Sequence, residues 1–236
     1  MYAFIENVLL DKQDHPIYHQ VEELRKELKH SPERIEVLDL GAGSRKDNKC
    51  LRKVSDIART AAKPAKYGQL LYRTARHYGC HQVMELGTSL GLTTSYLSAA
   101  AGEQGKVVTL EGAPAIAGKA LGHFQQLGLH NIVQVTGDFD EKLPEALAIM
   151  PKPELVYVDG NHRREPTLRY FEAFREQCGE NGIMVFDDIH WSKGMEQSWD
   201  TIRKDASVTC TIDLFFIGIV FFRRSFKEKV DFMIRY

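Results

Sequence analysis

Three carboxylates stand at the ends of two short apolar segments in the second half of the chain. Asp159 follows residues 155–158, and Asp187 and Asp188 follow residues 183–186. Short apolar segments that alternate with helical patterns predict parallel strands, and adjacent strands lie about 4.8 Å apart. We therefore expect the three carboxylates to converge at one edge of a sheet, where oxygen ligands of this kind suit Mg²⁺. In the alternative, Asp159 contacts a cofactor and the other two acids cap the following helix.

Two histidines lie close to these acids in the sequence. His162 comes three residues after Asp159, and His190 comes two residues after Asp188. Imidazole titrates near neutral pH, so either histidine could act as a general base toward an accepting hydroxyl. Trp191, which follows His190, could form a wall of the substrate pocket.

A glycine-rich turn joins a predicted strand to a predicted helix within residues 83–98. Gly87 and Gly91 have no Cβ, so the chain can turn tightly there, and the following helix offers free N–H groups. Glu111 lies 24 residues after Gly87, at the end of the next predicted strand. A carboxylate at that place can accept both hydroxyl hydrogens of a ribose. Together these features predict a site for a cofactor that contains a nucleoside.

The glycine turn has a competing interpretation. Gly87-Thr88-Ser89-Leu90-Gly91 matches the G-x-S-x-G pattern of serine hydrolases, in which Ser89 would be the nucleophile. That fold needs extra strands before the turn, whereas residues 1–82 are predicted to be mainly helical. It also takes its acid and histidine from separate loops, whereas Asp187 and His190 are three residues apart.

The N-terminal part carries a second glycine pattern and a local positive charge. Charged helical sequence follows Gly41 and Gly43, so we expect a turn there and not the main cofactor loop. Residues 45–66 hold eight Lys or Arg against two Asp. We expect residues 41–66 to form part of a cap over an acceptor.

Composition excludes several classes of protein. The chain has 236 residues, 43% of them hydrophobic, and a formal net charge of −1, so no global basic field for nucleic acid exists. The longest apolar run, residues 214–222, is about half of what a membrane-spanning helix needs. Four cysteines without a C-x-x-C pair predict reduced thiols. We expect a cytoplasmic protein without membrane or nucleic-acid partners, and homo-oligomer formation stays open.

From residue 66 onward, short apolar strands alternate with helices, which predicts a parallel sheet covered on both faces. Residues 208–222 contain two β-rich runs only a few residues apart, which is too close for a parallel crossover and predicts an antiparallel hairpin. The expected fold class is α/β, a Rossmann-like doubly wound sheet of seven strands with the last antiparallel. We expect an N-terminal helical extension over residues 1–62 and one domain over residues 63–236.

These motifs resemble the class I S-adenosylmethionine-dependent methyltransferases over roughly residues 63–223. VMELGTSLG is similar to the family's first motif, with Glu85 in the acidic position. Thr88 and Ser89 replace its commoner glycine, as in the metal-dependent O-methyltransferase branch. VVTLEG is similar to the second motif, and QVTGDFDE to the segment that bonds the adenine amino group.

Within the class, VYVDGNH and VFDDIHW resemble catechol and caffeoyl-CoA type O-methyltransferases and antibiotic-tailoring relatives. Catechol-type enzymes usually carry Asp-Asn where this chain has Asp187-Asp188, and the tailoring relatives carry two acids. Those relatives also place a proposed base at the offset of His162 from Asp159.

The resemblance implies transfer of a methyl group from S-adenosylmethionine to a hydroxyl of a small molecule, assisted by Mg²⁺. It implies metal ligands at Asp159, Asp187 and Asp188, and catalytic roles for His162 and Asp159. The cofactor contacts that it implies are Glu85, Gly87, Thr88, Ser89, Gly91, Glu111, Gly112, Asp138, Phe139 and Asp159. The alternatives are a serine hydrolase that uses Ser89 and a non-catalytic methyltransferase-like binding protein.

Overall fold

A computed structural model describes residues 2–38, 49–223 and 228–236. The predicted turn at Gly41 and Gly43 lies outside these residues. The chain divides into two compact units, one of residues 1–83 and 87–149 and the other of residues 84–86 and 150–236.

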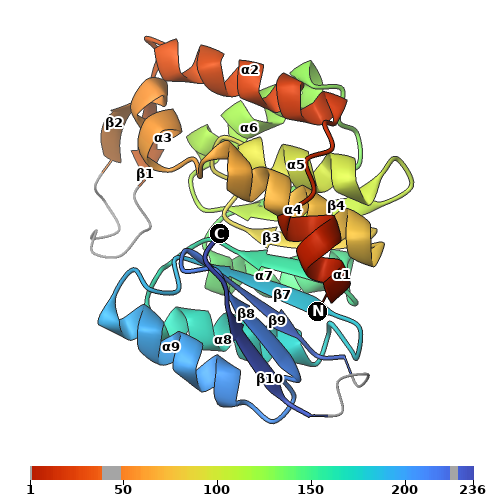
Figure 1. Ribbon diagram of the computed structural model, residues 1–236. Coiled ribbons are helices and arrows are strands. Elements are labelled where there is room, and N and C mark those ends of the chain that lie inside the picture. Colours follow the sequence, from red (N-terminus) through yellow and green to blue (C-terminus); the bar gives the residue numbers. More distant parts are fainter. Residues whose placement is uncertain (1, 39–48, 224–227) are drawn as a thin grey trace. The chain divides into compact units, whose positions relative to one another are not determined.

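The main sheet contains eight strands. Their bounds are β3 Gln82–Leu86, β4 Lys106–Glu111, β5 Ile132–Thr136, β6 Leu155–Val158, β7 Ile183–Asp187, β8 Cys210–Asp213, β9 Ile217–Phe221 and β10 Val230–Met233. The order across the sheet is β10-β8-β9-β7-β6-β3-β4-β5 (Figure 1). This arrangement confirms the α/β fold class, but the sheet has one strand more than the seven predicted. The extra strand is β10, whose four residues alternate in burial and are too short to stand out in the sequence.

Strand pairing confirms the predicted hairpin. Strands β4 and β5 are parallel, as are β6 and β7. Strand β9 runs antiparallel to both β7 and β8, with Asp187 opposite Ile217 and Asp213 opposite Gly218. The turn between β8 and β9 therefore lies at the end of β7 that carries Asp187.

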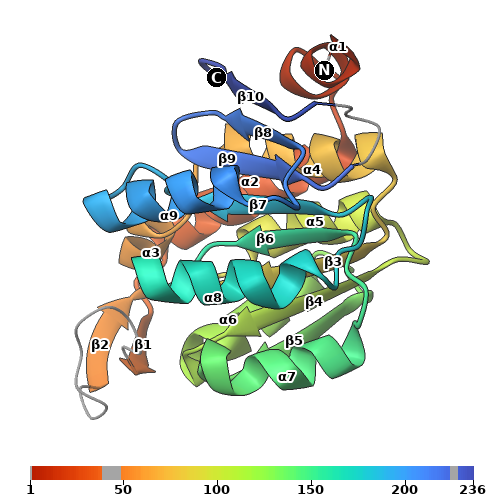
Figure 2. The ribbon, with the colours of Figure 1, turned by 90° about the horizontal axis from the view of Figure 1, so that it is seen from below.

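The first unit holds most of the helices. Their bounds are α1 Tyr2–Phe4, η1 Ile5–Leu9, α2 Pro16–His30, α3 Val54–Thr60, α4 Ala65–Tyr78, α5 Leu92–Ala101, α6 Pro114–Gln126 and α7 Phe139–Ile149. Helices α5 and α6 pack on one face of the β4–β5 pair and α7 on the other (Figure 2). Helix α4 ends at Gly79, which adopts the left-handed conformation with φ +65°.

The N-terminal extension contains helices, as predicted, and also a strand pair that was not predicted. Strand β1 (Arg34–Leu38) pairs antiparallel with β2 (Lys49–Lys53) in a separate two-stranded sheet. Ile35 and Val37 are buried while the neighbouring Arg34 and Glu36 are exposed. This alternation is the pattern of a strand with one buried face.

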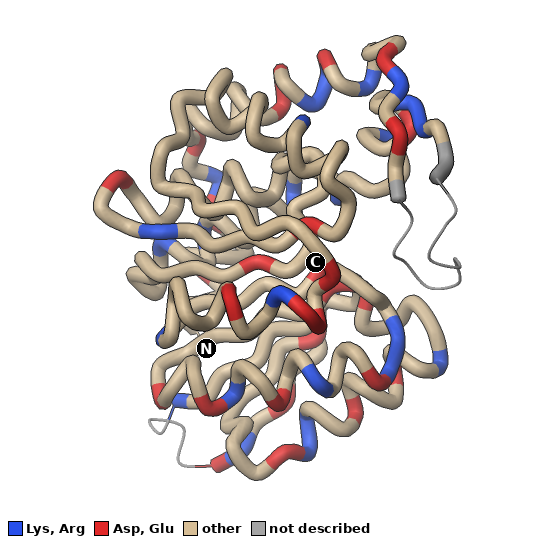
Figure 3. The backbone as a smooth tube through the Cα atoms, turned by 180° about the vertical axis from the view of Figure 1, so that it is seen from behind, with Lys and Arg blue, Asp and Glu red and all other residues tan. Residues whose placement is uncertain are grey.

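Helix α2 is anchored to α5 by a buried tyrosine. Both signs of charge are spread along α2 (Figure 3), and Glu22 pairs with Arg25 of the same helix at 3.0 Å. The hydroxyl of Tyr96, in α5, donates to Glu22 Oε1 at 2.9 Å. Burial and the Glu22 charge raise the pKa of Tyr96, so its hydroxyl stays protonated and donates.

We expect Tyr96→Phe to lower the free energy of unfolding by about 1 to 2 kcal/mol, because a buried hydrogen bond to a charged acceptor is lost. Tyr2→Phe makes the same change at an exposed site and should stay within about 0.5 kcal/mol of the wild type. Urea titrations followed by circular dichroism measure both. Equal losses in the two variants would contradict the proposed anchor.

In the second unit, helices α8 (Arg164–Arg175) and α9 (Lys193–Lys204) run side by side along one face of its strands (Figure 2). Helix α9 starts at Ser192, whose hydroxyl accepts the backbone N–H of Met195 at 3.2 Å.

Two further features concern the cysteines and the lengths of the helices. Cys80, Cys178 and Cys210 are buried, and among the described residues none of the three is joined in a disulfide. Within the described parts of the chain, every helix is too short or too polar to cross a bilayer.

Candidate functional site

Two of the predicted acids and one histidine form a cluster in the second unit. Asp159, His162 and Asp187 each place one ligand atom within 4.8 Å of the others'. His162 Nε2 lies 3.4 Å from Asp159 Oδ1. Asp187 is buried, whereas the other two side chains are half-buried. We call these three residues the acidic cluster.

Tyr157 adds a donor to the acidic cluster and was not singled out from the sequence. Its hydroxyl donates to Asp159 Oδ2 at 3.2 Å. Burial raises the pKa of Tyr157 well above its ordinary value, and the charges of Asp159, Asp187 and Glu85 raise it further. The tyrosine therefore stays a neutral donor among negative charges. A polar residue within an otherwise apolar strand, two positions before an acid, was the available signal.

The donor set of the acidic cluster fits a divalent cation. Carboxylate oxygens suit Mg²⁺ and Mn²⁺, and an imidazole nitrogen extends the choice to other transition metals. Crowding of Asp159, Asp187 and Glu85 around Tyr157 also favours a positive charge at this place.

Asp188 lies outside this group of three. Its backbone has φ +53°, its N–H donates to the carbonyl of Phe216 at 2.7 Å, and its carbonyl accepts from Trp191 at 2.9 Å. Its role as a metal ligand stays a prediction. The N-cap residue of α9 is Ser192, whose hydroxyl accepts a backbone N–H of the helix, and not Asp187 or Asp188.

The glycine loop of the first unit is tied to β4. The backbone N–H groups of Gly87 and Thr88 both donate to the carbonyl of Leu110, at 2.9 and 3.0 Å. The hydroxyls of Thr88 and Thr109 share a hydrogen bond at 2.6 Å. These bonds fix the loop at the end of β4.

Glu111 holds the loop from the other side. Its Oε2 accepts the backbone N–H of Ser89 at 2.8 Å, and its Oε1 accepts that of Ala113 at 2.9 Å. Each carboxylate oxygen can accept more than one hydrogen bond, so these contacts leave capacity for the hydroxyls of a ribose. The Ser89 that the hydrolase interpretation uses as a nucleophile thus contributes its backbone N–H to this arrangement.

The remaining predicted cofactor residues surround Glu111 or lie in the second unit. Gly112 follows Glu111 directly, and the N–H of Gly137 donates to the Glu111 carbonyl at 2.9 Å. Asp138 Oδ1 accepts the N–H of Asp140 at 2.9 Å, just before Phe139 begins α7. Asp138 and Phe139 are half-buried. The other two predicted contacts, Glu85 and Asp159, belong to the second unit, where Glu85 is fully buried in β3.

Strained backbone marks the loops that follow the strands. Among the described residues other than glycine, four have a positive φ, and each lies in the loop directly after β3, β6, β7 or β8. They are Ser89, Asn161, Asp188 and Phe215. Such conformations are costly for side chains with a Cβ and are frequent at functional sites.

We expect Gly91→Ala to lower the free energy of unfolding by at least about 2 kcal/mol. Gly91 has φ +80°, and an added Cβ would lie 2.5 Å from the Phe124 ring. Gly118→Ala in α6 meets nothing within 4 Å and should gain about 0.5 to 1 kcal/mol. Urea unfolding of the two variants tests this. A neutral Gly91→Ala would show that the loop has room for a side chain.

A family described as "Methyltransferase domain" matches residues 84–189, a segment that includes the glycine loop, Glu111 and the acidic cluster. This segment of the chain is therefore similar to a methyltransferase domain. The loop at residues 87–91 lies within the matched segment, and nothing in these comparisons supports Ser89 as a hydrolase nucleophile.

Individual proteins are similar to this chain in sequence or in fold. A catechol O-methyltransferase from Mycobacterium tuberculosis is 32% identical over 126 residues, 53% of this chain and 56% of that protein. The chain thus spans about half the length of this curated relative. Two solved O-methyltransferases share the fold. One, from Bacillus cereus with SAH, has TM-score 0.60 and 16% identity, covering 92% of this chain and 95% of that one. The other, TomG from Streptomyces achromogenes with SAM, has TM-score 0.61 and 18% identity, covering 93% and 94%.

Proposed function

We propose that the protein transfers a methyl group from S-adenosylmethionine to a hydroxyl of a small-molecule acceptor, with a divalent cation at the acidic cluster. The observation that carries the proposal is the Glu111 carboxylate bonded to the glycine loop, within the segment that matches a methyltransferase domain. The catechol O-methyltransferase that is similar in sequence and the two solved O-methyltransferases that share the fold support it.

The first unit would bind the cofactor. S-adenosylmethionine supplies a methyl group already activated by its sulfonium. Gly91 lets the glycine loop pack closely on α6, because an added Cβ would meet the Phe124 ring. Glu111 would accept the ribose hydroxyls, while Asp138 would accept the adenine amino group. These contacts orient the cofactor and leave the chemistry to the acceptor side.

The second unit would prepare the acceptor. A divalent cation supplies a Lewis acid when bound. Asp159 and Asp187 would hold it, and Tyr157 keeps Asp159 in place through its hydrogen bond. His162 Nε2 would accept the proton of the acceptor hydroxyl, unless it is itself a ligand of the cation.

We expect Glu111→Ala to weaken binding of S-adenosylmethionine and S-adenosylhomocysteine by about 2 to 3 kcal/mol, because charge-assisted hydrogen bonds to the ribose are lost. Calorimetry measures this, with Glu23→Ala, an exposed site on α2, as the matched control. A 2′,3′-dideoxy analogue of S-adenosylhomocysteine separates direct contact from loop anchoring. If the contact is direct, this analogue should bind the wild type weakly, and Glu111→Ala should lower its affinity little further. Wild-type affinity in the variant would remove Glu111 from the cofactor site.

Cation binding can be measured without an acceptor. We expect Asp159→Asn and Asp187→Asn to weaken Mn²⁺ binding at least about tenfold, with exposed Asp200→Asn as the control. Asp188→Asn tests the third predicted ligand. His162→Ala assigns the histidine, since weakened Mn²⁺ binding makes it a ligand and unchanged binding leaves it as the base. A protein that binds S-adenosylmethionine but no cation, and gives no turnover, would be the non-catalytic alternative.

A further inference from the structure

The turn between β8 and β9 presents aromatic side chains beside the loop that carries Asp188. Phe215 is 61% exposed and Phe216 is 47% exposed. The carbonyl of Phe216 accepts the N–H of Asp188 at 2.7 Å, which joins the turn to the end of β7. The Phe215 ring stacks on His190, with centroids 5.4 Å apart and planes 28° apart. The turn is thus continuous with the segment that supplies Asp187.

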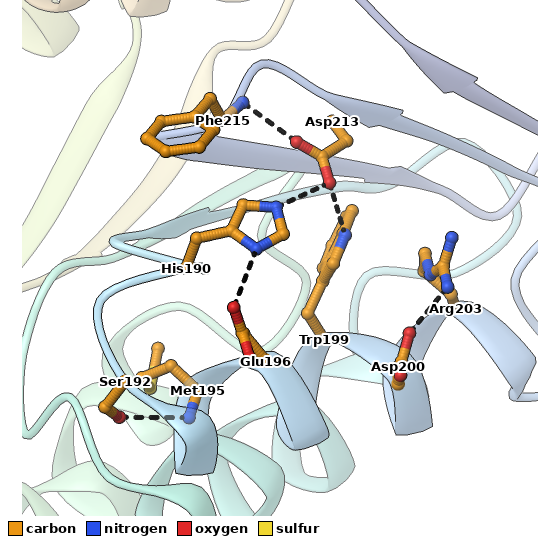
Figure 4. A network of polar contacts seen from close by, with 9 residues as sticks. All are labelled: His190, Ser192, Met195, Glu196, Trp199, Asp200, Arg203, Asp213 and Phe215. Atoms are coloured by element: carbon orange, nitrogen blue, oxygen red, sulfur yellow. Dashed lines mark hydrogen bonds and ion pairs between the residues drawn. The ribbon is translucent and has the colours of Figure 1, made fainter.

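A buried carboxylate holds this turn (Figure 4). Asp213 is 5% exposed and receives three hydrogen bonds. Its Oδ1 accepts the backbone N–H of Phe215 at 2.8 Å. Its Oδ2 accepts His190 Nε2 at 2.9 Å and Trp199 Nε1 at 3.1 Å. One side chain therefore fixes both the Phe215 backbone and the ring on which Phe215 stacks.

The cost of this arrangement indicates that the exposed ring has a use. Phe215 has φ +73°, a conformation in which glycine is the usual residue and a bulky side chain is strained. Closing the hairpin needs no ring at this position. The buried Asp213 nevertheless holds Phe215 in this strained conformation, and most of the Phe215 side chain is exposed to water. Such strain persists only where the surroundings over-determine it, and it concentrates at ligand sites.

We propose that Phe215 is a specificity-determining residue that contacts a planar apolar ring of the methyl acceptor, and that Asp213 is the residue that positions it. The inference rests on the proposed function, because the acceptor oxygens would lie at the acidic cluster while the body of the acceptor meets the aromatic turn. Aromatic faces favour flat ring partners through stacking and edge contacts.

Binding of two matched probes tests the proposal. Catechol and cis-1,2-cyclohexanediol present the same adjacent pair of oxygens, but only catechol has a planar ring. Each is titrated by calorimetry into the full chain with saturating S-adenosylhomocysteine and Mg²⁺. We expect Phe215→Ala to weaken catechol about tenfold and to leave the diol nearly unchanged. Leu121→Ala, at a half-exposed apolar site on α6, is the control and should change neither.

A double-mutant cycle tests the positioning role. In Asp213→Asn the amide replaces one acceptor by a donor, so it cannot satisfy all three N–H groups. We expect this variant to lower the affinity for catechol to the same extent as Phe215→Ala and to leave the affinity for S-adenosylhomocysteine unchanged. The double variant should bind catechol no more weakly than either single one. Trp199→Phe removes one of the donors to Asp213 and leaves the hydrogen bond of the Phe215 amide in place. This variant should lower the free energy of unfolding and leave the affinity for catechol unchanged.

The outcomes separate the two proposals. A wild type that does not bind S-adenosylhomocysteine overturns the proposed function, and this inference with it. If S-adenosylhomocysteine binds normally, three results overturn the inference alone. The first is absence of catechol binding to the wild type. The second is a catechol affinity of Phe215→Ala that equals the wild-type affinity. Additive effects in the double variant are the third, and they would leave Asp213 a merely structural role. Since Phe215 is exposed, its variant tests the contact even if Asp213→Asn does not fold.

Discussion

Burial of negative charge at the ends of β3, β6 and β7 is the constraint on which the rest of this structure depends. Glu85 and Asp187 are 0% and 1% exposed, and both act on Tyr157 together with Asp159. Removing carboxylates from water is expensive unless donors or cations face them. The strands around them are almost wholly apolar, so the surrounding core stabilises the fold against this cost. A bound cation would relieve it, which links stability of the second unit to the chemistry proposed there.

In both units a carboxylate at the end of a strand holds a loop by accepting a backbone N–H. In the first unit, Glu111 at the end of β4 fixes the glycine loop of residues 87–91. In the second, Asp213 fixes a turn that carries a large exposed ring. Both acids accept backbone N–H groups at residues with positive φ, Ser89 and Phe215. Each strained loop is thus held by a carboxylate at a strand end: Glu111 of β4 holds the glycine loop, and Asp213, the last residue of β8, holds the turn that follows it.

Sequence patterns were sufficient where a feature is local or repeats in a simple register. Alternating strands and helices predicted the fold class, and the spacing of Asp159 and Asp187 predicted their approach. Strand β10 was missed because it is short and pairs with β8, far away in the chain. The strand pair β1–β2 was missed because charged residues on its exposed face resemble a helical surface. The roles of Tyr157 and Asp213 depend on tertiary partners, which no spacing in the sequence reveals.

Strand β10 has a consequence for how the protein behaves in a crowded solution. Without it, the sheet would end at β8, a strand whose four residues are all buried. Parallel pairing with β10 moves the open edge to a strand with exposed Asp231, flanked by exposed Lys229 and Arg235. Charged edges discourage the strand-to-strand addition by which sheets aggregate. Resistance to aggregation therefore depends on four residues that take no part in the proposed chemistry, and detachment of β10 alone would give other chains an apolar edge to extend.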